Sequence, residues 1–214
     1  MIINSILTLC EKRRTEPETG YSEEEIRREA SRCLQCEVPP CTEACPAHLN
    51  IKKYIYEARE GFYREALETI LEGLPFPGTC GRTCPAPCED ACMRYVYEPT
   101  AIRGIKRFIA DQFMEIDWYP KVEVSREERI AVIGSGPAGI TAALFLVKKG
   151  YSVDVFEALA EPGGIMRIGI PEYRLPKEIL DCEISNIEKL GVDIKTRTKI
   201  DFLEPFFMQG YKAI

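Results

Sequence analysis

Apolar side chains recur at helical spacing through much of the first half of the chain. The segments 51–60 (IKKYIYEARE) and 62–71 (FYREALETIL) each place an apolar residue about every three or four positions, and Gly61 separates them. We therefore expect two helices here. This half has no strong strand pattern and no repeat other than two groups of cysteines, so it is predicted to be all-α.

Polar residues next to the apolar patterns supply helix start signals. Ser22 and Glu25 form an S-x-x-E capping box, which predicts a helix that runs to about Arg32. Asn50 is expected to cap the next helix. A further helix is predicted over about 101–116. The first half of the chain is therefore expected to consist of helices around the cysteines.

From Arg129 onward the pattern changes to short β-branched runs, glycines and helical segments, which is typical of an α/β fold. The join lies near Ser125, in the polar stretch 117–128, which contains a helix-breaking proline. The chain is therefore predicted to be multi-domain. A helical domain is expected over 1–124 and a Rossmann-like domain over 125–214.

Composition and charge narrow the classes of function. Twenty-eight Lys and Arg against 34 Asp and Glu give a net charge of −6 and a pI near 5.1, so nucleic acid is not an expected partner. The start, MIINSILTLCEKRR, does not read as a secretory signal, and no apolar stretch approaches the ~20 residues of a membrane span. We expect a cytoplasmic protein without membrane contact. In that reducing compartment, ten cysteines are expected to hold metal rather than to form disulfides.

Eight of the ten cysteines form two compact groups. The groups read Cys33-x2-Cys36-x4-Cys41-x3-Cys45-Pro46 and Cys80-x3-Cys84-Pro85-x2-Cys88-x3-Cys92. Three closely spaced thiolates can reach three irons of one cluster, while a fourth cysteine before a proline often serves the other cluster, as in two-cluster ferredoxins. We therefore expect two 4Fe-4S clusters with crossed ligation.

A pair of four-cysteine zinc sites is the alternative for these thiolates. Such sites usually pair two knuckles of the C-x2-C type, and this sequence has only one, so the spacing favours iron-sulfur clusters. A regulatory zinc and nucleotide-binding module would follow from the alternative. Metal and sulfide analysis separates the two hypotheses.

Three further candidates for chemistry lie outside this pattern. Cys10 and Cys182 are interpreted as small buried hydrophobes or free thiols. His48, the single histidine, is interpreted as a capping or exposed residue, with a hydrogen bond to a cluster as the alternative. Since there is no second histidine and no paired acid, no side chain is predicted to act as a catalytic acid, base or nucleophile.

A nucleotide-binding pattern follows the domain boundary. An apolar run leads into Gly134-x-Gly136-x-x-Gly139 and then into a helical segment. The first glycine permits the tight turn, the second lets backbone approach a pyrophosphate, and the third allows close packing of the helix, whose N-terminus supports the phosphates. A second strand over 152–156 ends at Glu157, which is expected to accept hydrogen bonds from ribose hydroxyls.

Two alternatives remain for this part of the chain. A glycine turn kept only for packing would leave Glu157 unexplained. Farther on, Gly163 and Gly164 form a flexible turn that can either pass close to a flavin's pyrophosphate or serve as a surface loop.

Together these motifs resemble the glutamate synthase small (beta) subunit family, which includes the N-terminal part of dihydropyrimidine dehydrogenase. The resemblance covers nearly the whole chain and rests on RCLQCEVPPCTEACP, FPGTCGRTCPAPCEDAC, AIRGIKRF, VIGSGPAG and GGIMRIGIPEYRLP. In such proteins two 4Fe-4S clusters pass electrons between an FAD, which is reduced by NADPH or NADH, and a distant acceptor. The resemblance therefore implies the electron-transfer part of an NAD(P)H-dependent flavin and iron-sulfur oxidoreductase.

The resemblance also implies which residues hold the cofactors. One cluster is expected on Cys33, Cys36, Cys41 and Cys92, and the other on Cys45, Cys84 and Cys88. Family members can supply a Glu or Gln as the fourth ligand of the second cluster, whereas Lys106 stands at the matching place and an ammonium has no lone pair. Cys80 is the candidate to fill the site. FAD is expected on Gly134, Ser135, Gly136, Pro137, Ala138, Gly139, Glu157, Gly164 and Arg167.

The chain departs from the resembling proteins in length. Those proteins continue into an ATG-containing strand, an NAD(P)H domain with its own glycine motif and a closing FAD segment. We therefore expect an FAD domain that is incomplete at its C-terminus, NAD(P)H binding in downstream segments or a partner, and a redox partner subunit in a hetero-oligomer. The alternative is a ferredoxin-like electron-transfer subunit whose nucleotide fold serves as an interaction surface.

Overall fold

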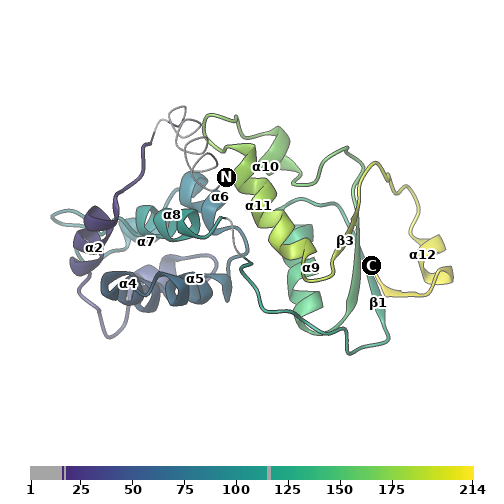
Figure 1. The fold of residues 1–214 in the computed structure, drawn as a ribbon, viewed down its shortest axis with the longest axis horizontal. Coiled ribbons are helices and arrows are strands. Elements are labelled where there is room, and N and C mark those ends of the chain that lie inside the picture. Colours follow the sequence, from purple (N-terminus) through teal and green to yellow (C-terminus); the bar gives the residue numbers. More distant parts are fainter. Residues whose placement is uncertain (1–15, 17, 115–116) are drawn as a thin grey trace, which may run out of the picture. The chain divides into compact units, whose positions relative to one another are not determined.

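The computed structural model describes Glu16, residues 18–114 and residues 117–214, and the chain divides into two compact units. The units comprise Met1–Met114 with Glu172–Pro176, and Glu115–Pro171 with Lys177–Ile214. Among the described residues, the first unit contains helices only, and the second contains a parallel sheet with helices (Figure 1). The domain boundary near Ser125 stays a prediction.

In the described part of the first unit the longer helices are α2 (Glu23–Ser31), α4 (Ile51–Glu60), α5 (Tyr63–Leu71) and α8 (Ile102–Gln112). The predicted capping box is present, because Glu25 N donates to Ser22 Oγ at 3.3 Å and Ser22 N donates to Glu25 Oε2 at 2.8 Å. Asn50 caps α4 by accepting a hydrogen bond from Lys53 N at 3.2 Å. Helix α8 ends earlier than the sequence pattern predicts, because Phe113 leaves the helical conformation with a φ of −120°.

The core of this unit forms between the longer helices. Helix α2 packs on α4, α4 packs on α5, and α5 packs on α8. Their inward-facing side chains are almost completely buried, among them Ile26, Tyr54, Leu67 and Ile105. Burial of each such side chain contributes about 1.5–3 kcal/mol, so the apolar pattern read from the sequence is what holds this unit together.

Three short helices carry or flank the cysteines, and the helical pattern of the sequence did not predict them. They are α3 (Pro40–Ala44), α6 (Pro77–Thr83) and α7 (Pro87–Asp90). Each begins with a proline at its first position, where a backbone N–H has no helical partner and the fixed φ of proline suits the helix. Helix α6 packs so closely on α8 that a Cβ on Gly81 would lie 2.7 Å from Arg107 Cα, so this contact requires glycine.

A four-stranded parallel sheet forms the second unit, in the order β3-β2-β1-β4. The strands are β1 (Arg129–Ile133), β2 (Ser152–Phe156), β3 (Asp193–Lys195) and β4 (Tyr211–Ala213). Strands β1 and β2 pair without a register shift. Because their carboxyl ends meet at one edge, the glycine turn after β1 and Glu157 after β2 lie together there.

Helices α9 (Pro137–Lys148), α10 (Ile165–Ile168), α11 (Lys177–Glu188) and α12 (Glu204–Met208) complete this unit. Helix α9 packs on β1, β2 and α11 through buried side chains that include Ile140 and Leu144 (Figure 1). A small cluster joins β2, α12 and β4, where the rings of Phe156 and Phe206 meet edge-on at 4.9 Å. No helix in the described part of the chain is long and apolar enough to cross a membrane.

Candidate functional site

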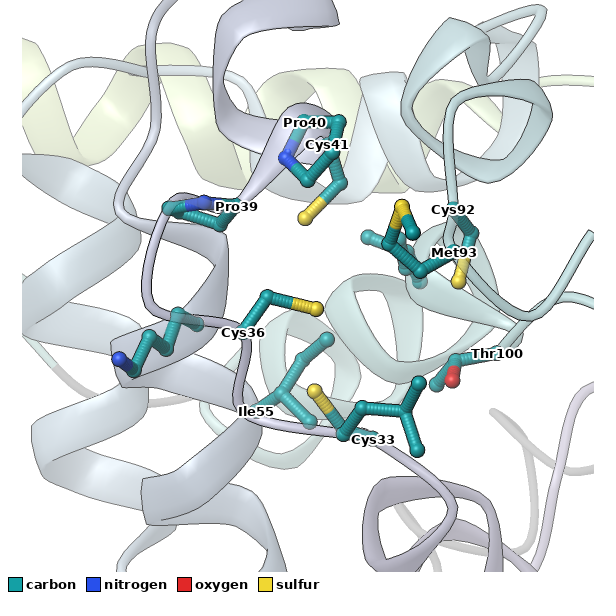
Figure 2. Close-up of a pocket in the computed structure, with 12 residues that line it drawn as sticks. Cys33, Cys36, Pro39, Pro40, Cys41, Ile55, Cys92, Met93 and Thr100 are labelled. Atoms are coloured by element: carbon teal, nitrogen blue, oxygen red, sulfur yellow. The ribbon is translucent and has the colours of Figure 1, made fainter.

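Four cysteines from distant parts of the sequence line one pocket of the helical unit. Cys33 and Cys36 lie in the loop after α2, Cys41 lies in α3, and Cys92 follows α7. Figure 2 shows their side chains around a common space, whose empty volume is about 400 Å³ including its opening to solvent. Apolar side chains make up much of the remaining wall, namely Leu34, Pro39, Pro40, Ile55, Met93 and Ile102. The structure thus brings together the four residues that the resemblance implies for one cluster, and their ligation stays a prediction.

The open centre of this pocket bears on which metal group fits. In a tetrahedral zinc site every sulfur lies about 2.3 Å from a single ion. Among the residues that the structure describes, no three His, Cys, Asp or Glu side chains are arranged to hold one metal ion. A four-iron cluster instead occupies a space between four sulfurs, and an apolar pocket with four cysteines on its wall fits that requirement.

Gln35 holds the sulfur of Cys33 in place, a contact that the sequence pattern did not predict. Its backbone has a positive φ of +53°, and its side-chain amide donates to Cys33 Sγ at 3.4 Å and to Lys52 O at 3.2 Å. One amide therefore joins the first cysteine to α4. A polar residue inside the C-x2-C segment is the only sequence signal that pointed to this contact.

Burial governs the protonation of the first cysteine group. The pKa of the Cys41 thiol is raised to about 11, mainly by desolvation and also by the neighbouring Cys33. Desolvation is also the largest effect on Cys33 and raises its pKa, although hydrogen bonds from Gln35 act in the opposite direction. Because metal ligation requires thiolates, metal binding must release these protons.

Cys45, Cys84 and Cys88 form a second group. The pKa of the Cys88 thiol is raised to about 12, mainly by burial; the cation of Lys106 lowers it, while Glu89, Cys45 and Cys84 raise it. Helix α3, which Cys45 follows, packs on α7, which carries Cys88, and Cys84 lies three residues before α7. The structure thus brings together the three residues that the resemblance implies for the other cluster.

Tyr54 interacts with cysteines of both groups. Its side chain is buried in α4, and desolvation raises its pKa most strongly. The same hydroxyl interacts electrostatically with Cys41 of the first group and with Cys45 and Cys88 of the second. The two groups are therefore neighbours within one helical unit.

The loop between Cys84 and Cys88 has the conformation found after Cys33. Ala86 has a positive φ of +58°, and its backbone N–H donates to Cys84 Sγ at 3.3 Å. In each group, then, the residue two positions after a cysteine adopts the left-handed conformation and donates to its sulfur. Such hydrogen bonds orient the sulfur and stabilise negative charge on it.

Cys80 lies in α6, one turn before Cys84, and is half-buried. Its carbonyl accepts a hydrogen bond from Cys84 N at 3.2 Å, so the backbone of α6 connects the two cysteines directly. Whether its thiol completes the second cluster stays a prediction. Lys106, in α8, is only 7% exposed.

The glycine turn of the second unit has the conformation that a phosphate-binding loop requires. Gly134 has a φ of +93°, and a Cβ on Gly139 would lie 1.9 Å from Gly134 O, so neither position accepts a side chain. A Cβ on Gly136 would meet nothing within 4 Å, which leaves open space beside the backbone at the start of α9. Pro137 and Ala138 form the first two positions of that helix.

Glu157 is tied to the same turn. Its Oε2 accepts hydrogen bonds from Ser135 N at 2.9 Å and from Ser135 Oγ, and its Oε1 accepts from Leu159 N at 2.8 Å. Burial of Glu157 raises its pKa, but the hydrogen bonds from Ser135 and Leu159 outweigh this effect, and the net pKa is lowered. The carboxylate therefore stays ionised at the edge of the sheet, and a role toward ribose stays a prediction.

The downstream glycine pair packs on this turn. Gly163 N donates to Ser135 O at 3.0 Å, and a Cβ on Gly164 would lie 2.7 Å from Gly136 Cα. Arg167 donates to Pro162 O and forms an ion pair with Asp181. Gly164 is thus placed beside Gly136, as a loop near a bound pyrophosphate requires, while Arg167 is engaged in holding its own loop.

His48 and Cys182, the candidates outside the cysteine groups and the glycine turn, have no surroundings within the described part of the chain that would activate them. His48 is exposed, with a φ of +46°, and its backbone N–H donates to Cys45 O at 2.8 Å. Cys182 lies half-buried in α11, where desolvation raises its pKa to about 11, so its thiol is not activated. Cys10 lies outside the described residues.

Comparison with known families matches both units. Residues 10–118 match the family described as dihydropyrimidine dehydrogenase domain II, 4Fe-4S cluster, and residues 132–195 match the NAD(P)-binding Rossmann-like domain family. Fold and site therefore define an iron-sulfur protein in which a helical cluster domain precedes a parallel-sheet Rossmann-like segment. Because the first match spans half of the chain, the chain belongs to the 4Fe-4S family of dihydropyrimidine dehydrogenase domain II.

Curated relatives carry the same pair of segments. The chain is 41% identical to the beta subunit of NADP(+)-dependent formate dehydrogenase of Moorella thermoacetica over 201 residues, which cover 82% of this chain and 28% of that protein. It is 40% identical over 180 residues to the PreT subunit of NAD-dependent dihydropyrimidine dehydrogenase of Escherichia coli K12, covering 81% and 43%. It is 36% identical over 192 residues to the small chain of NADPH glutamate synthase of Bacillus subtilis, covering 84% and 39%.

These relatives confirm the resemblance to the glutamate synthase small subunit family, which includes the N-terminal part of dihydropyrimidine dehydrogenase. The chain spans less than half the length of the curated relatives it matches. The predicted order of a helical iron-sulfur domain and a Rossmann-like segment is confirmed as well.

Proposed function

We propose that this chain is the electron-transfer part of an FAD- and NAD(P)H-dependent iron-sulfur oxidoreductase. In this proposal two 4Fe-4S clusters connect an FAD to a partner protein, and the chain works in a hetero-oligomer in the cytoplasm. The observation that carries the proposal is the pocket in which four cysteines from separate segments meet. The relatives are subunits of enzymes whose names include NADP(+), NAD or NADPH, and this supports an NAD(P)H-linked reaction.

The first cluster is proposed on Cys33, Cys36, Cys41 and Cys92, and the second on Cys45, Cys84 and Cys88 with Cys80 as the fourth ligand. When bound, such clusters accept and release single electrons. The protein residues supply four thiolates to each, donate hydrogen bonds to sulfur from Gln35 and Ala86, and keep water away with apolar side chains. No side chain has to form a covalent intermediate.

FAD is proposed at the glycine turn of the second unit. Gly134 and Gly139 give the turn its shape, Gly136 leaves space for a pyrophosphate, and Glu157 is an ionised acceptor for ribose hydroxyls. Gly164, which packs on Gly136, would close the loop over the phosphates. The isoalloxazine ring and NAD(P)H are proposed to bind on segments or a partner that complete this domain.

Anaerobic rapid mixing tests this function. The chain, combined with the segments or partner that complete its FAD domain, is mixed with NADPH or NADH while flavin and cluster absorbance are followed separately. We expect flavin reduction first and cluster reduction after it. In Cys41→Ser we expect flavin reduction to persist while electron delivery to an external acceptor falls at least tenfold, whereas the matched control Cys182→Ser keeps the wild-type rate. The proposed function would be wrong if the wild-type protein bound no flavin or if its clusters stayed oxidised. The alternative of a ferredoxin-like subunit, whose nucleotide fold serves as an interaction surface, would then remain.

A further inference from the structure

We propose that the ammonium of Lys106, a residue that is largely buried, is the counter-charge of the cluster held by Cys45, Cys84 and Cys88 and makes that cluster easier to reduce. This inference rests on the proposed function, because it assumes that the second cysteine group holds a cluster. Lys106 acts in this account as a positioning and tuning residue through its charge. It is not a ligand, since a protonated amine has no free lone pair.

The placement of Lys106 follows from how α8 is fastened to the loop that carries Cys84 and Cys88. Arg103, one turn earlier on α8, donates from its backbone N to Glu89 Oε1 at 2.7 Å and from its side chain to Cys84 O at 3.4 Å. Positions three apart on a helix lie on the same face, so Lys106 faces this loop as well. Its low exposure of 7% agrees with an inward-facing side chain.

The charges around Lys106 leave its own charge without a close partner. Its cation stabilises the anionic forms of Cys88 and of the half-buried Glu89. Within the described residues, however, no carboxylate lies at salt-bridge distance from Lys106. Because the Lys106 side chain is largely buried, its charge is weakly screened, and an anion close to it is favourable.

Neighbouring buried cations of the same unit provide a contrast. Arg82 forms ion pairs with Glu16 at 3.1 Å and with Asp111 at 2.9 Å, and Arg107, next to Lys106 in sequence, also pairs with Glu16. These arginines are neutralised by protein carboxylates. Lys106 differs from these arginines because, among the described residues, it forms no ion pair and interacts with the thiol of Cys88 as well as with Glu89.

A cluster on four thiolates is the anion that this arrangement fits. One electron enters the cluster on reduction, no bond to the protein forms or breaks, and the net charge becomes one unit more negative. An ammonium held nearby in a region of low dielectric stabilises the reduced form more than the oxidised form. Lys106 should therefore raise the reduction potential of this cluster relative to the same cluster with a neutral residue at position 106.

Redox titration monitored by paramagnetic resonance tests the inference on the complete, flavin-containing protein. Leucine is the test substitution, because an oxygen-bearing side chain at position 106 could itself ligate iron. We expect Lys106→Leu to move the midpoint potential of one cluster to more negative values. The shift should correspond to at least a tenfold change in the ratio of oxidised to reduced cluster, which is 59 mV for one electron. The other cluster should keep its midpoint, and Lys106→Arg should restore most of the shift. Lys53→Gln, on the surface of α4, is the matched control and should change neither midpoint.

Each outcome of this titration either supports or overturns the inference about Lys106. A Lys106→Leu protein with both clusters and unchanged midpoints would overturn the inference. Lys106→Leu could fail to retain the second cluster, and Lys106→Arg then decides. If Lys106→Arg keeps this cluster with the wild-type midpoint, the role of the charge is supported. If Lys106→Arg also loses the cluster, the inference is overturned. A wild-type protein without a second cluster would instead defeat the proposed function, which separates the two failures.

Discussion

Cys33 and Cys92 line the same pocket, although the first follows the first predicted helix and the second closes the other cysteine group. The chain between them contains α3 to α7, so the pocket forms only when the helical unit has folded. This relationship supports the proposed crossed use of the two groups. It also explains why cluster binding and folding should be coupled in this unit.

Substitution of either cysteine should damage one and the same cluster. We expect Cys33→Ser and Cys92→Ser each to lose about half of the iron, because one of two clusters is lost. Iron analysis and paramagnetic spectra measure this directly. The crossed assignment is wrong if the spectrum of Cys92→Ser matches that of Cys45→Ser instead of that of Cys33→Ser.

Cys80 should be the fourth ligand of the second cluster. We expect Cys80→Ala to lose that cluster, or to shift its midpoint, because Lys106 cannot ligate iron. Introducing Lys106→Glu in the Cys80→Ala background should restore the cluster, since a carboxylate at that position can reach iron in family members. Intact clusters with unchanged potentials in Cys80→Ala would remove Cys80 from the ligand set.

Gln35 should tune the first cluster through its hydrogen bond to Cys33 Sγ. We expect Gln35→Met to move the midpoint of this cluster to more negative values by about 20–60 mV, which corresponds to the ~0.5–1.5 kcal/mol of one hydrogen bond. The second cluster should not respond, and the control Gln209→Met in the other unit should leave both midpoints unchanged. A Gln35→Met protein with wild-type potentials would mean that this contact only orients the loop.

Flavin affinity should depend on Gly136 more than on Glu157. We expect Gly136→Val to abolish FAD binding, because its side chain would fill the open space beside the turn. Glu157→Ala should weaken binding by about 1.5–3 kcal/mol, the range of charge-assisted hydrogen bonds. Fluorescence titration of the completed protein measures both effects, with melting curves as the control for folding. Tight binding to Gly136→Val would show that the pyrophosphate lies elsewhere.

Much of this architecture could be predicted from the sequence because local signals and global fold agree. The capping box at Ser22, the Asn50 cap and the apolar spacing of α4 and α5 depend on a few neighbouring residues, and all of them occur in the structure. The order of strand, glycine turn and helix after Arg129 is equally local. The resemblance then supplied the grouping of cysteines, which spacing alone left open.

Other features depend on contacts between distant segments and could not be read from a pattern. The short helices α3, α6 and α7 have too few residues to show an apolar period, although a proline at the first position of each was an available signal. The hydrogen bond from Gln35 to Cys33 requires a left-handed backbone at a residue that is not glycine. The contact of Gly164 with Gly136 requires the loop to return to the turn after β1.

Metal analysis is the sharpest test of whether the two cysteine groups hold two 4Fe-4S clusters. The protein is purified without oxygen, and iron, zinc and acid-labile sulfide are measured per chain together with the paramagnetic spectrum of the reduced form. We expect about eight irons and about eight sulfides per chain, with signals from two interacting clusters. About two zinc ions without sulfide, or about four irons that Cys45→Ser does not affect, would contradict this expectation.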